Sequence, residues 1–326
     1  MLQPTLKYFI RQISACAALC VALTTPALAA GYAYITNQAS NNVSVIDISK
    51  QQVIATIPVG KAPVGVAVSA KLAKVYISNV EGQSISIIDA NKFEHLEDFP
   101  IKGSPVGLAI APNSNVLYVA DWYEDRILEI NLSDMQQQRE IHIGKAPAGI
   151  IVSPDGKKLY VANRDSNDIA IIDTEKLVVL SRINVGEHPY GLTLSPDGQK
   201  LYVVNVYSNT VSLVDTETGQ IDTVRVGEHP YCVAVNPNGQ YIYVTNTQGD
   251  TVSVVDIALK KTIASIHVGG FPEGIAFQAA TQQIFVANWF DNTVSVIDAS
   301  TNKVTASILT GNQSRAFGQF ILEPVH

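Results

Sequence analysis

The sequence has 326 residues, of which 47% are hydrophobic and 16% are charged, and its formal net charge is −7. This composition is able to bury a large core and therefore excludes an intrinsically disordered chain. The acidic balance argues against a broad nucleic-acid-binding surface, although it leaves room for a local site.

The first 29 residues are predicted to be a signal peptide. Lys7 and Arg11 form a basic start, residues 13–23 are apolar, and Ala27 and Ala29 offer small side chains for cleavage. The apolar run is too short to span a bilayer, and no later segment approaches 18 uninterrupted apolar residues. We expect cleavage after Ala29, which leaves a protein without a membrane span in the periplasm or outside the cell.

Cleavage of the predicted signal peptide also determines how many cysteines the mature protein keeps. Cys16 superficially ends a lipobox, but the basic residues upstream of it stand where the apolar run should be. Cleavage removes Cys16 and Cys20 and leaves Cys232 alone, so no intramolecular disulfide is expected. It also changes the formal charge to −9, from 20 Lys and Arg against 29 Asp and Glu.

Seven repeats fill residues 30–326, which we assign to one domain. Each contains a motif such as "YVTN", and the motifs begin at Tyr34, Tyr76, Tyr118, Tyr160, Tyr202, Tyr243 and Phe285. Each period of 41 or 42 residues holds four short apolar stretches. Four strands in such a period predict an all-β, seven-bladed β-propeller of four-stranded antiparallel blades.

Turn residues and the chain ends indicate how the blades connect. "SPDG" at 153–156 and at 195–198, and "NPNG" at 236–239, predict tight hairpins in which Gly takes a positive φ. The C-terminal stretch 317–323 matches the first strand of a blade. We therefore expect it to complete the N-terminal blade and close the ring.

These motifs resemble the YVTN β-propeller repeat family, which occurs in bacterial periplasmic and archaeal surface proteins. The Tyr-Val-x-Asn strand, the "VSVID" strand, the "VG" turn and the "PxGxAxSP" strand cover nearly all of residues 31–326. The resemblance implies a seven-bladed fold. Similar propellers include lactonases, streptogramin lyases, the propeller of a copper reductase and proteins that only bind ligands or partners, so it implies no single activity.

Candidate site residues lie where the repeats differ, in the loop that enters the innermost strand. The residues just before its Pro are Ala62, Ser104, Ala146, His188, His229, Phe271 and, where Pro is lost, Arg315. The residues just after it are Val64, Val106, Ala148, Tyr190, Tyr231, Glu273 and Phe317. Four consecutive blades thus carry large polar or aromatic groups, which we interpret as a ligand site at the mouth of the central channel. In the alternative, they only cap blade edges.

The loop between the second and third strands is expected on the same face. It contributes Trp122, Arg164 and Trp289 to the candidate ligand-binding residues. Tryptophans on one face are able to stack on a base, a ring or a partner's side chain. In the alternative, each covers its neighbouring blade.

Metal and catalytic signatures are sparse. His188, His229 and Glu273, from adjacent blades, offer two nitrogens and one oxygen for a divalent metal; no other cofactor is predicted. The sequence contains no Gly-rich phosphate loop, no CxxCH haem motif and no nucleophile elbow. Cys232 replaces a framework Gly and is either a thiol nucleophile or a small buried residue.

Three function classes remain open. The first is an exported, monomeric binding propeller that takes a protein partner or small ligand on the channel-mouth face. The second is a metal-assisted lactonase- or lyase-like enzyme that uses His188, His229 and Glu273. The third is single-stranded nucleic-acid binding through Trp122 and Trp289, which the negative charge disfavours.

Overall fold

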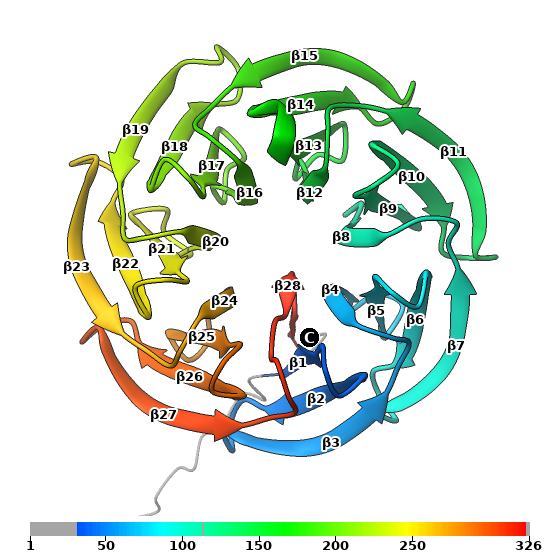
Figure 1. Cartoon of the computed structure of the whole chain (residues 1–326), viewed down its shortest axis with the longest axis horizontal. Coiled ribbons are helices and arrows are strands. Elements are labelled where there is room, and N and C mark those ends of the chain that lie inside the picture. Colours follow the sequence, from blue (N-terminus) through cyan, green and yellow to red (C-terminus); the bar gives the residue numbers. More distant parts are fainter. Residues whose placement is uncertain (1–30, 113, 324–326) are drawn as a thin grey trace, which may run out of the picture.

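The computed structural model describes residues 31–112 and 114–323. The predicted signal peptide lies outside this part of the chain. The described strands form seven sheets that are arranged as blades around a central axis (Figure 1). Each blade has four antiparallel strands, and one of the seven sheets gains a short fifth strand, which pairs in parallel. The predicted seven-bladed propeller is thereby confirmed.

Each blade runs outward from the axis in chain order, except that the innermost strand of the first blade comes from the C-terminus. Its innermost strand is β29 (Ile321–Leu322), β4 (Pro63–Ser69), β8 (Pro105–Ile110), β12 (Pro147–Val152), β16 (Pro189–Leu194), β20 (Pro230–Val235) or β24 (Pro272–Gln278). The second is β1 (Tyr32–Asn37), β5 (Lys74–Asn79), β9 (Val116–Asp121), β13 (Lys158–Asn163), β17 (Lys200–Asn205), β21 (Tyr241–Asn246) or β25 (Gln283–Asn288). We number the blades 1 to 7 in this order.

The outer half of each blade repeats the same pattern. The third strand is β2 (Asn42–Asp47), β6 (Ser84–Asp89), β10 (Arg126–Asn131), β14 (Asp168–Asp173), β18 (Thr210–Asp215), β22 (Thr251–Asp256) or β26 (Thr293–Asp298). The outermost is β3 (Gln52–Pro58), β7 (Glu94–Pro100), β11 (Gln136–His142), β15 (Val178–Asn184), β19 (Ile221–Arg225), β23 (Lys261–His267) or β27 (Lys303–Leu309). One 3₁₀ turn, η1 (Arg164–Ser166), follows β13.

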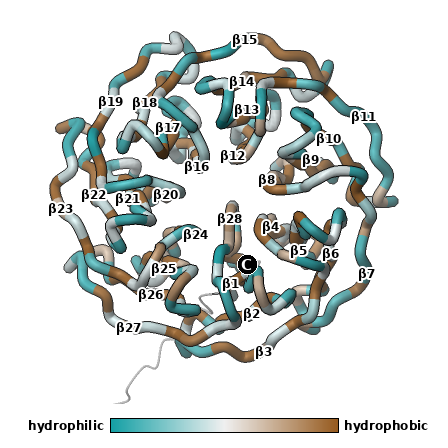
Figure 2. The backbone as a smooth tube through the Cα atoms, in the orientation of Figure 1, coloured by the Kyte–Doolittle hydropathy of each residue, from teal (hydrophilic) through white to brown (hydrophobic). Residues whose placement is uncertain are grey.

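The core lies between the blades. Second and third strands such as β17 and β18 are buried along most of their length, because both faces of each sheet pack against neighbouring blades. The repeated aromatic of the second strand is almost fully buried in every blade, from Tyr34 at 0% to Tyr118 at 3% exposure. Outermost strands mix hydrophobic and hydrophilic residues and remain largely exposed (Figure 2).

Buried Asn side chains connect the strands at one end of most blades. In blade 5, Asn205 Nδ2 donates to Thr210 Oγ1 and to Ser212 Oγ, both at 3.0 Å, while Asn205 Oδ1 accepts from Gly186 N at 3.1 Å. Asn37, Asn79, Asn246 and Asn288 make similar bonds. The Asn of "YVTN" is therefore a structural residue.

Glycine in the innermost strand permits close approach of neighbouring blades. A Cβ added to Gly107 would collide with the carbonyl oxygen of Ala148 in the next blade. Side-chain hydroxyls then connect the blades at this level. Thr245 Oγ1, for example, accepts from Cys232 N and donates to the carbonyl of Glu273.

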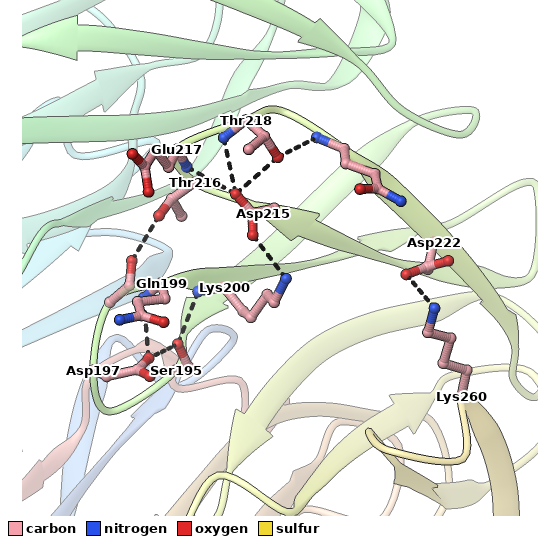
Figure 3. Close-up of polar contacts among 12 residues, drawn as sticks. Ser195, Asp197, Gln199, Lys200, Asp215, Thr216, Glu217, Thr218, Asp222 and Lys260 are labelled. Carbon is pink, nitrogen blue, oxygen red and sulfur yellow. Dashed lines mark hydrogen bonds and ion pairs between the residues drawn. The ribbon is translucent and has the colours of Figure 1, made fainter.

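The face that carries the "SPDG" hairpins, which we call the turn face, is held by local side-chain bonds. Ser195 Oγ accepts from Lys200 N, and Asp197 accepts from Gln199 N, both shown in Figure 3. Gly198 adopts a φ of 71°, as the sequence predicts. Asp215, one of the repeated strand-end aspartates, accepts from Thr218 N at 2.8 Å. These aspartates stabilise turns and do not form a carboxylate cluster.

The C-terminal stretch closes the ring in two steps. Ile321 and Leu322 of β29 pair with Ala33 and Tyr32 of β1, which completes blade 1 as predicted. Upstream, β28 (Phe317–Gly318) pairs in parallel with the inner edge of β4 in blade 2. The chain therefore runs along the inner rim of the ring, beside β4, before it ends (Figure 1).

Candidate binding face

The two loop types that carry the candidate residues lie on one face, opposite the turn face, which we call the entry face. In blade 5, Val206 N, at the start of the loop between β17 and β18, donates to the carbonyl of His188 in the loop that enters β16. The same bond recurs in the other blades at 3.0–3.1 Å, for example from Trp289 N to the carbonyl of Phe271. The sequence-based placement of both loops on one face is correct.

The register of the last repeat differs from the sequence alignment. Gln313 N donates to Asn292 Oδ1, as His188 N donates to Asn167 Oδ1 in blade 5. Gln313 also has a positive φ of 59°, and His188 one of 54°. Gln313 is thus the counterpart of His188, and Arg315 is the counterpart of Tyr190. The alignment that placed Arg315 before the lost Pro, and Phe317 after it, is wrong by two residues.

With this register, four consecutive blades place large side chains at one level, which we call the central layer: Tyr190, Tyr231, Glu273 and Arg315. Arg315 Nε lies 2.5 Å from Glu273 Oε2, and Arg315 Nη2 donates to the Tyr231 hydroxyl at 2.5 Å. The rings of Tyr190 and Tyr231 pack with centroids 4.3 Å apart. In blades 2 to 4 the same position holds Val64, Val106 and Ala148.

Each of the three guanidinium nitrogens of Arg315 makes a hydrogen bond within the protein. Its third nitrogen, Nη1, donates to Gln38 Oε1 at 3.2 Å. The side chain is 17% exposed and that of Glu273 is 4% exposed. Arg315 therefore connects blades 1, 6 and 7, and its geometry is that of a structural residue.

Burial of the central layer shifts the pKa values of its ionisable side chains. Burial raises the pKa of the Glu273 carboxyl, and the Arg315 guanidinium opposes that rise. Burial acts to lower the pKa of Arg315, but Glu273 and the nearby tyrosines outweigh it, so the net shift is upward. Burial also raises the pKa of Tyr231 well above its usual value. Both tyrosines therefore remain neutral phenols.

A second group of rings surrounds Tyr207, which follows Val206 in the blade 5 loop. The His188 ring stacks on Tyr207 with centroids 4.1 Å apart and an angle of 20° between the planes. His229 meets Tyr207 edge-on at 5.6 Å. The Arg164 guanidinium lies 5.8 Å from the Tyr207 centroid and 5.7 Å from that of Trp122. This group joins blades 3 to 6.

A third group lies in blade 7. Trp289 packs against Phe271 and Phe290, with centroids 5.6 and 4.9 Å apart. Its indole nitrogen donates to Gln38 Oε1 at 3.4 Å. Trp289 is half-buried, as is Trp122, whose ring lies 5.9 Å from that of Tyr190. The Trp289 ring thus packs within its own blade and bonds to blade 1, whereas the Trp122 ring reaches across to blade 5.

The exposed rings are the residues that follow these loop positions. Tyr123 is 75% exposed, Tyr207 52% and Phe290 63%. They come from blades 3, 5 and 7, and all stand on the entry face. Large aromatic groups exposed on one face commonly mark an interaction surface. Loop-by-loop comparison of the sequence finds these three positions, but only the structure shows that they protrude.

The predicted metal ligands are not brought together. Within residues 31–112 and 114–323, no group of three or more His, Cys, Asp or Glu side chains is placed to hold a metal ion. Glu273 is instead paired with Arg315, and His188 and His229 pack on either side of Tyr207. The proposed set of His188, His229 and Glu273 is therefore corrected.

Cys232 is buried, and burial raises the pKa of its thiol well above the usual value. A thiol with a raised pKa is a poor nucleophile at neutral pH, because little thiolate is present. The structure therefore supports the interpretation of Cys232 as a small buried residue.

The fold and this face define a seven-bladed β-propeller protein with an aromatic entry face. Residues 127–226, about 100 of the 326, match the family model described as "Lactonase, 7-bladed beta-propeller". This match and the fold confirm the recognition of a propeller similar to the lactonase-like ones. None of the curated proteins matches the sequence.

Solved structures share the fold at low sequence identity. A protein of unknown function from Desulfotomaculum acetoxidans superimposes with a TM-score of 0.79 at 17% identity, covering 90% of this chain and 100% of its own. Hydrazine synthase of Kuenenia stuttgartiensis gives 0.73 at 21%, covering 81% and 91%. The dihydro-heme d1 dehydrogenase NirN gives 0.66 at 14%, covering 86% and 64%. These similarities show the fold alone.

Proposed function

We propose that the protein is an exported propeller that binds a polypeptide partner on its entry face. The observation that carries this proposal is the exposure of Tyr123, Tyr207 and Phe290 on that one face. Aromatic side chains supply much of the binding energy of protein interfaces, since they bury a large area and lose little conformational entropy.

Charge favours a polypeptide over a nucleic acid as the partner. Arg164 pairs with Asp165 at 2.6 Å, and Arg315 pairs with Glu273, so the charge of each guanidinium is partly neutralised. The loops that enter blades 5 and 6 add the exposed carboxylates of Glu187 and Glu228, whereas the same loops of blades 2 and 4 carry the exposed Lys61 and Lys145. The part of the face around blades 5 and 6 would repel a phosphate backbone.

Export is part of the proposal and rests on the leader. Lys7 and Arg11, followed by the apolar residues 13–23 and the small Ala27 and Ala29, support cleavage and release of residues 30–326. Among the described residues, no helix is long and apolar enough to span a lipid bilayer.

The lactonase-like alternative has less support from the site. The family match covers under a third of the chain, and the residues proposed to hold its metal do not assemble. Propellers with this fold include both enzymes and binding proteins, so the fold does not decide between them.

A peptide-display selection against the purified protein tests the proposal. The variant Tyr123→Ser/Tyr207→Ser/Phe290→Ser should bind the selected peptides at least about thirtyfold more weakly, because one aromatic anchor is worth about 2 kcal/mol. The matched control is Ile54→Ser/Leu180→Ser/Ile263→Ser, which removes side chains of 41–53% exposure from the outermost strands. This control should retain full affinity.

Two results would overturn the proposal. One is unchanged affinity in the aromatic variant, and the other is equal loss in the control. Salt-dependent quenching of tryptophan by oligonucleotides would favour nucleic acid instead, and lactone turnover that is lost in His229→Ala would favour the enzyme.

A further inference from the structure

The central channel contains a cavity of about 750 Å³ between the central layer and the turn face. Its wall is made by the innermost strands, from the level of Gly107 and Cys232 down to their turns. Lining residues such as Lys71, Pro154 and Pro196 are exposed, so the cavity opens on the turn face. None of the four central-layer side chains lines it.

Phe317 closes the inner end. It lines the cavity, and its ring packs against those of Tyr190 and Tyr231 with centroids 5.0 and 6.2 Å apart. Side chains of the central layer therefore separate this cavity from the entry face. A ligand of the cavity would enter from the turn face and would not compete directly with a partner on the entry face.

The wall of the cavity is apolar and polar in nearly equal parts, and its few charged groups are exposed. Half-buried hydrophobic residues, among them Ile110, Val235 and Phe277, contribute to it. Only two lining residues, Lys71 and Glu323, carry a charge, and both are exposed. A charged ligand would lose its hydration inside the cavity without gaining a partner.

Polar groups are nevertheless available on the backbone. In six of the described blades the innermost strand is the edge of its sheet, so one side of its N–H and C=O groups has no partner strand. In blade 2, β28 pairs with this edge, which shows that the edge accepts a partner inside the channel. Thr193 of the blade 5 wall adds a hydroxyl.

We propose that this cavity binds an uncharged small molecule whose apolar part packs against the wall and whose polar groups bond to the exposed strand edges. Its volume lies within the roughly 300–1,000 Å³ of known small-molecule sites.

Two related dyes test the inference on the whole protein from residue 30 onwards. Phenylnaphthylamine is neutral, and anilinonaphthalene sulfonate has the same rings plus one negative charge. We expect saturable fluorescence enhancement by the neutral dye at one equivalent, with a dissociation constant at least tenfold lower than that of the sulfonate.

Variants then locate the site. Thr193→Phe fills the wall of blade 5 and should weaken binding of the neutral dye at least tenfold, whereas Thr223→Phe on the exposed outermost strand of the same blade should not. Ala276→Leu narrows the cavity from blade 7 and serves if Thr193→Phe does not fold. Melting curves report folding of each variant.

Three outcomes overturn the inference: no saturable binding of the neutral dye, equal affinity for the sulfonate, or unchanged affinity in folded Thr193→Phe and Ala276→Leu. Retained binding in the Tyr207→Ser variant would further support a site away from the entry face.

Discussion

Replacing Arg315 with methionine should destabilise the protein strongly, and the loss should depend on pH. The substitution leaves the Glu273 carboxylate, only 4% exposed, without its cationic partner. Removing one member of a buried pair typically costs about 3–5 kcal/mol, because an unpaired charge remains in the interior.

In Arg315→Met, Glu273 is able to avoid an unpaired buried charge by binding a proton. The free energy of that protonation sets how strongly the destabilisation depends on pH. Protonating a carboxyl with an ordinary pKa costs about 4 kcal/mol at about pH 7 but only about 1 kcal/mol at about pH 5. Burial raises the folded-state pKa of Glu273, and without Arg315 nothing opposes that rise. A raised pKa gives stability that is present at low pH and is lost as pH increases through the folded-state value. The variant should therefore recover about 2–3 kcal/mol between about pH 7 and about pH 5.

Urea denaturation followed by tryptophan fluorescence measures this effect. Trp289 is a direct reporter, because it shares Gln38 as a partner with Arg315. Arg315→Met/Glu273→Met, which removes both charges, should be close to the native protein in stability. Lys260→Met, which breaks the exposed pair with Asp222 visible in Figure 3, should change stability by less than about 1 kcal/mol.

The reasoning would be refuted in either of two ways. A destabilisation by Arg315→Met that is the same at both pH values would mean that Glu273 does not carry the cost. A double variant as unstable as the single one would mean that the lost packing matters and the stranded carboxylate does not.

Three further predictions concern the framework. Asn205→Ala should lower the free energy of unfolding by about 3 kcal/mol, because it deletes three hydrogen bonds of about 1 kcal/mol each, whereas the exposed Asn91→Ala should be neutral in the same denaturation assay. Cys232 should react with iodoacetamide at least tenfold more slowly in the native protein than in urea, since burial raises the pKa of its thiol, and equal rates would contradict that burial. Ala146→Gly should preserve or raise the melting temperature, because Ala146 has a φ of 49°, which Gly adopts more easily than Ala. Ala148→Gly, on the extended strand β12, should lower the melting temperature, and the reverse order of the two variants would contradict these backbone conformations.

The repeat period explains why so much of the fold could be predicted from the sequence. Each strand recurs seven times, so the alternation of hydrophobic and polar residues in one repeat can be compared with the other six. The order of the strands within a blade then places the two loop types on one face. The position of Arg315 could not be predicted in this way, because the last repeat departs from the pattern. Its repeat has Ser314 in place of the Pro that marks the register, and the hydrogen bond from Gln313 to Asn292 that restores the register is visible only in space.

The residues of the candidate site could be identified from the sequence, but their contacts with one another could not. Tyr190, Tyr231, Glu273 and Arg315 differ from the small residues of the other blades, but nothing in the sequence says that they pack against one another. Because they fill the channel at the entry face, the open cavity lies in the other half of the channel. Exposure likewise distinguishes Tyr207 from the half-buried tryptophans, and exposure depends on neighbours from other blades.

The route of the C-terminal stretch along the inner rim of the ring has a consequence for folding kinetics. The hydrogen bond from Ala316 N to Thr36 Oγ1 joins residues 280 positions apart, so blade 1 is the last to gain its inner strand during synthesis. Closing a loop of that length costs about 3 kcal/mol more entropy than closing a hairpin of about ten residues. A circular permutant, with its new ends in an exposed turn between two outer strands and its old ends joined, would make this contact local and move the long-range closure to the blade that was cut.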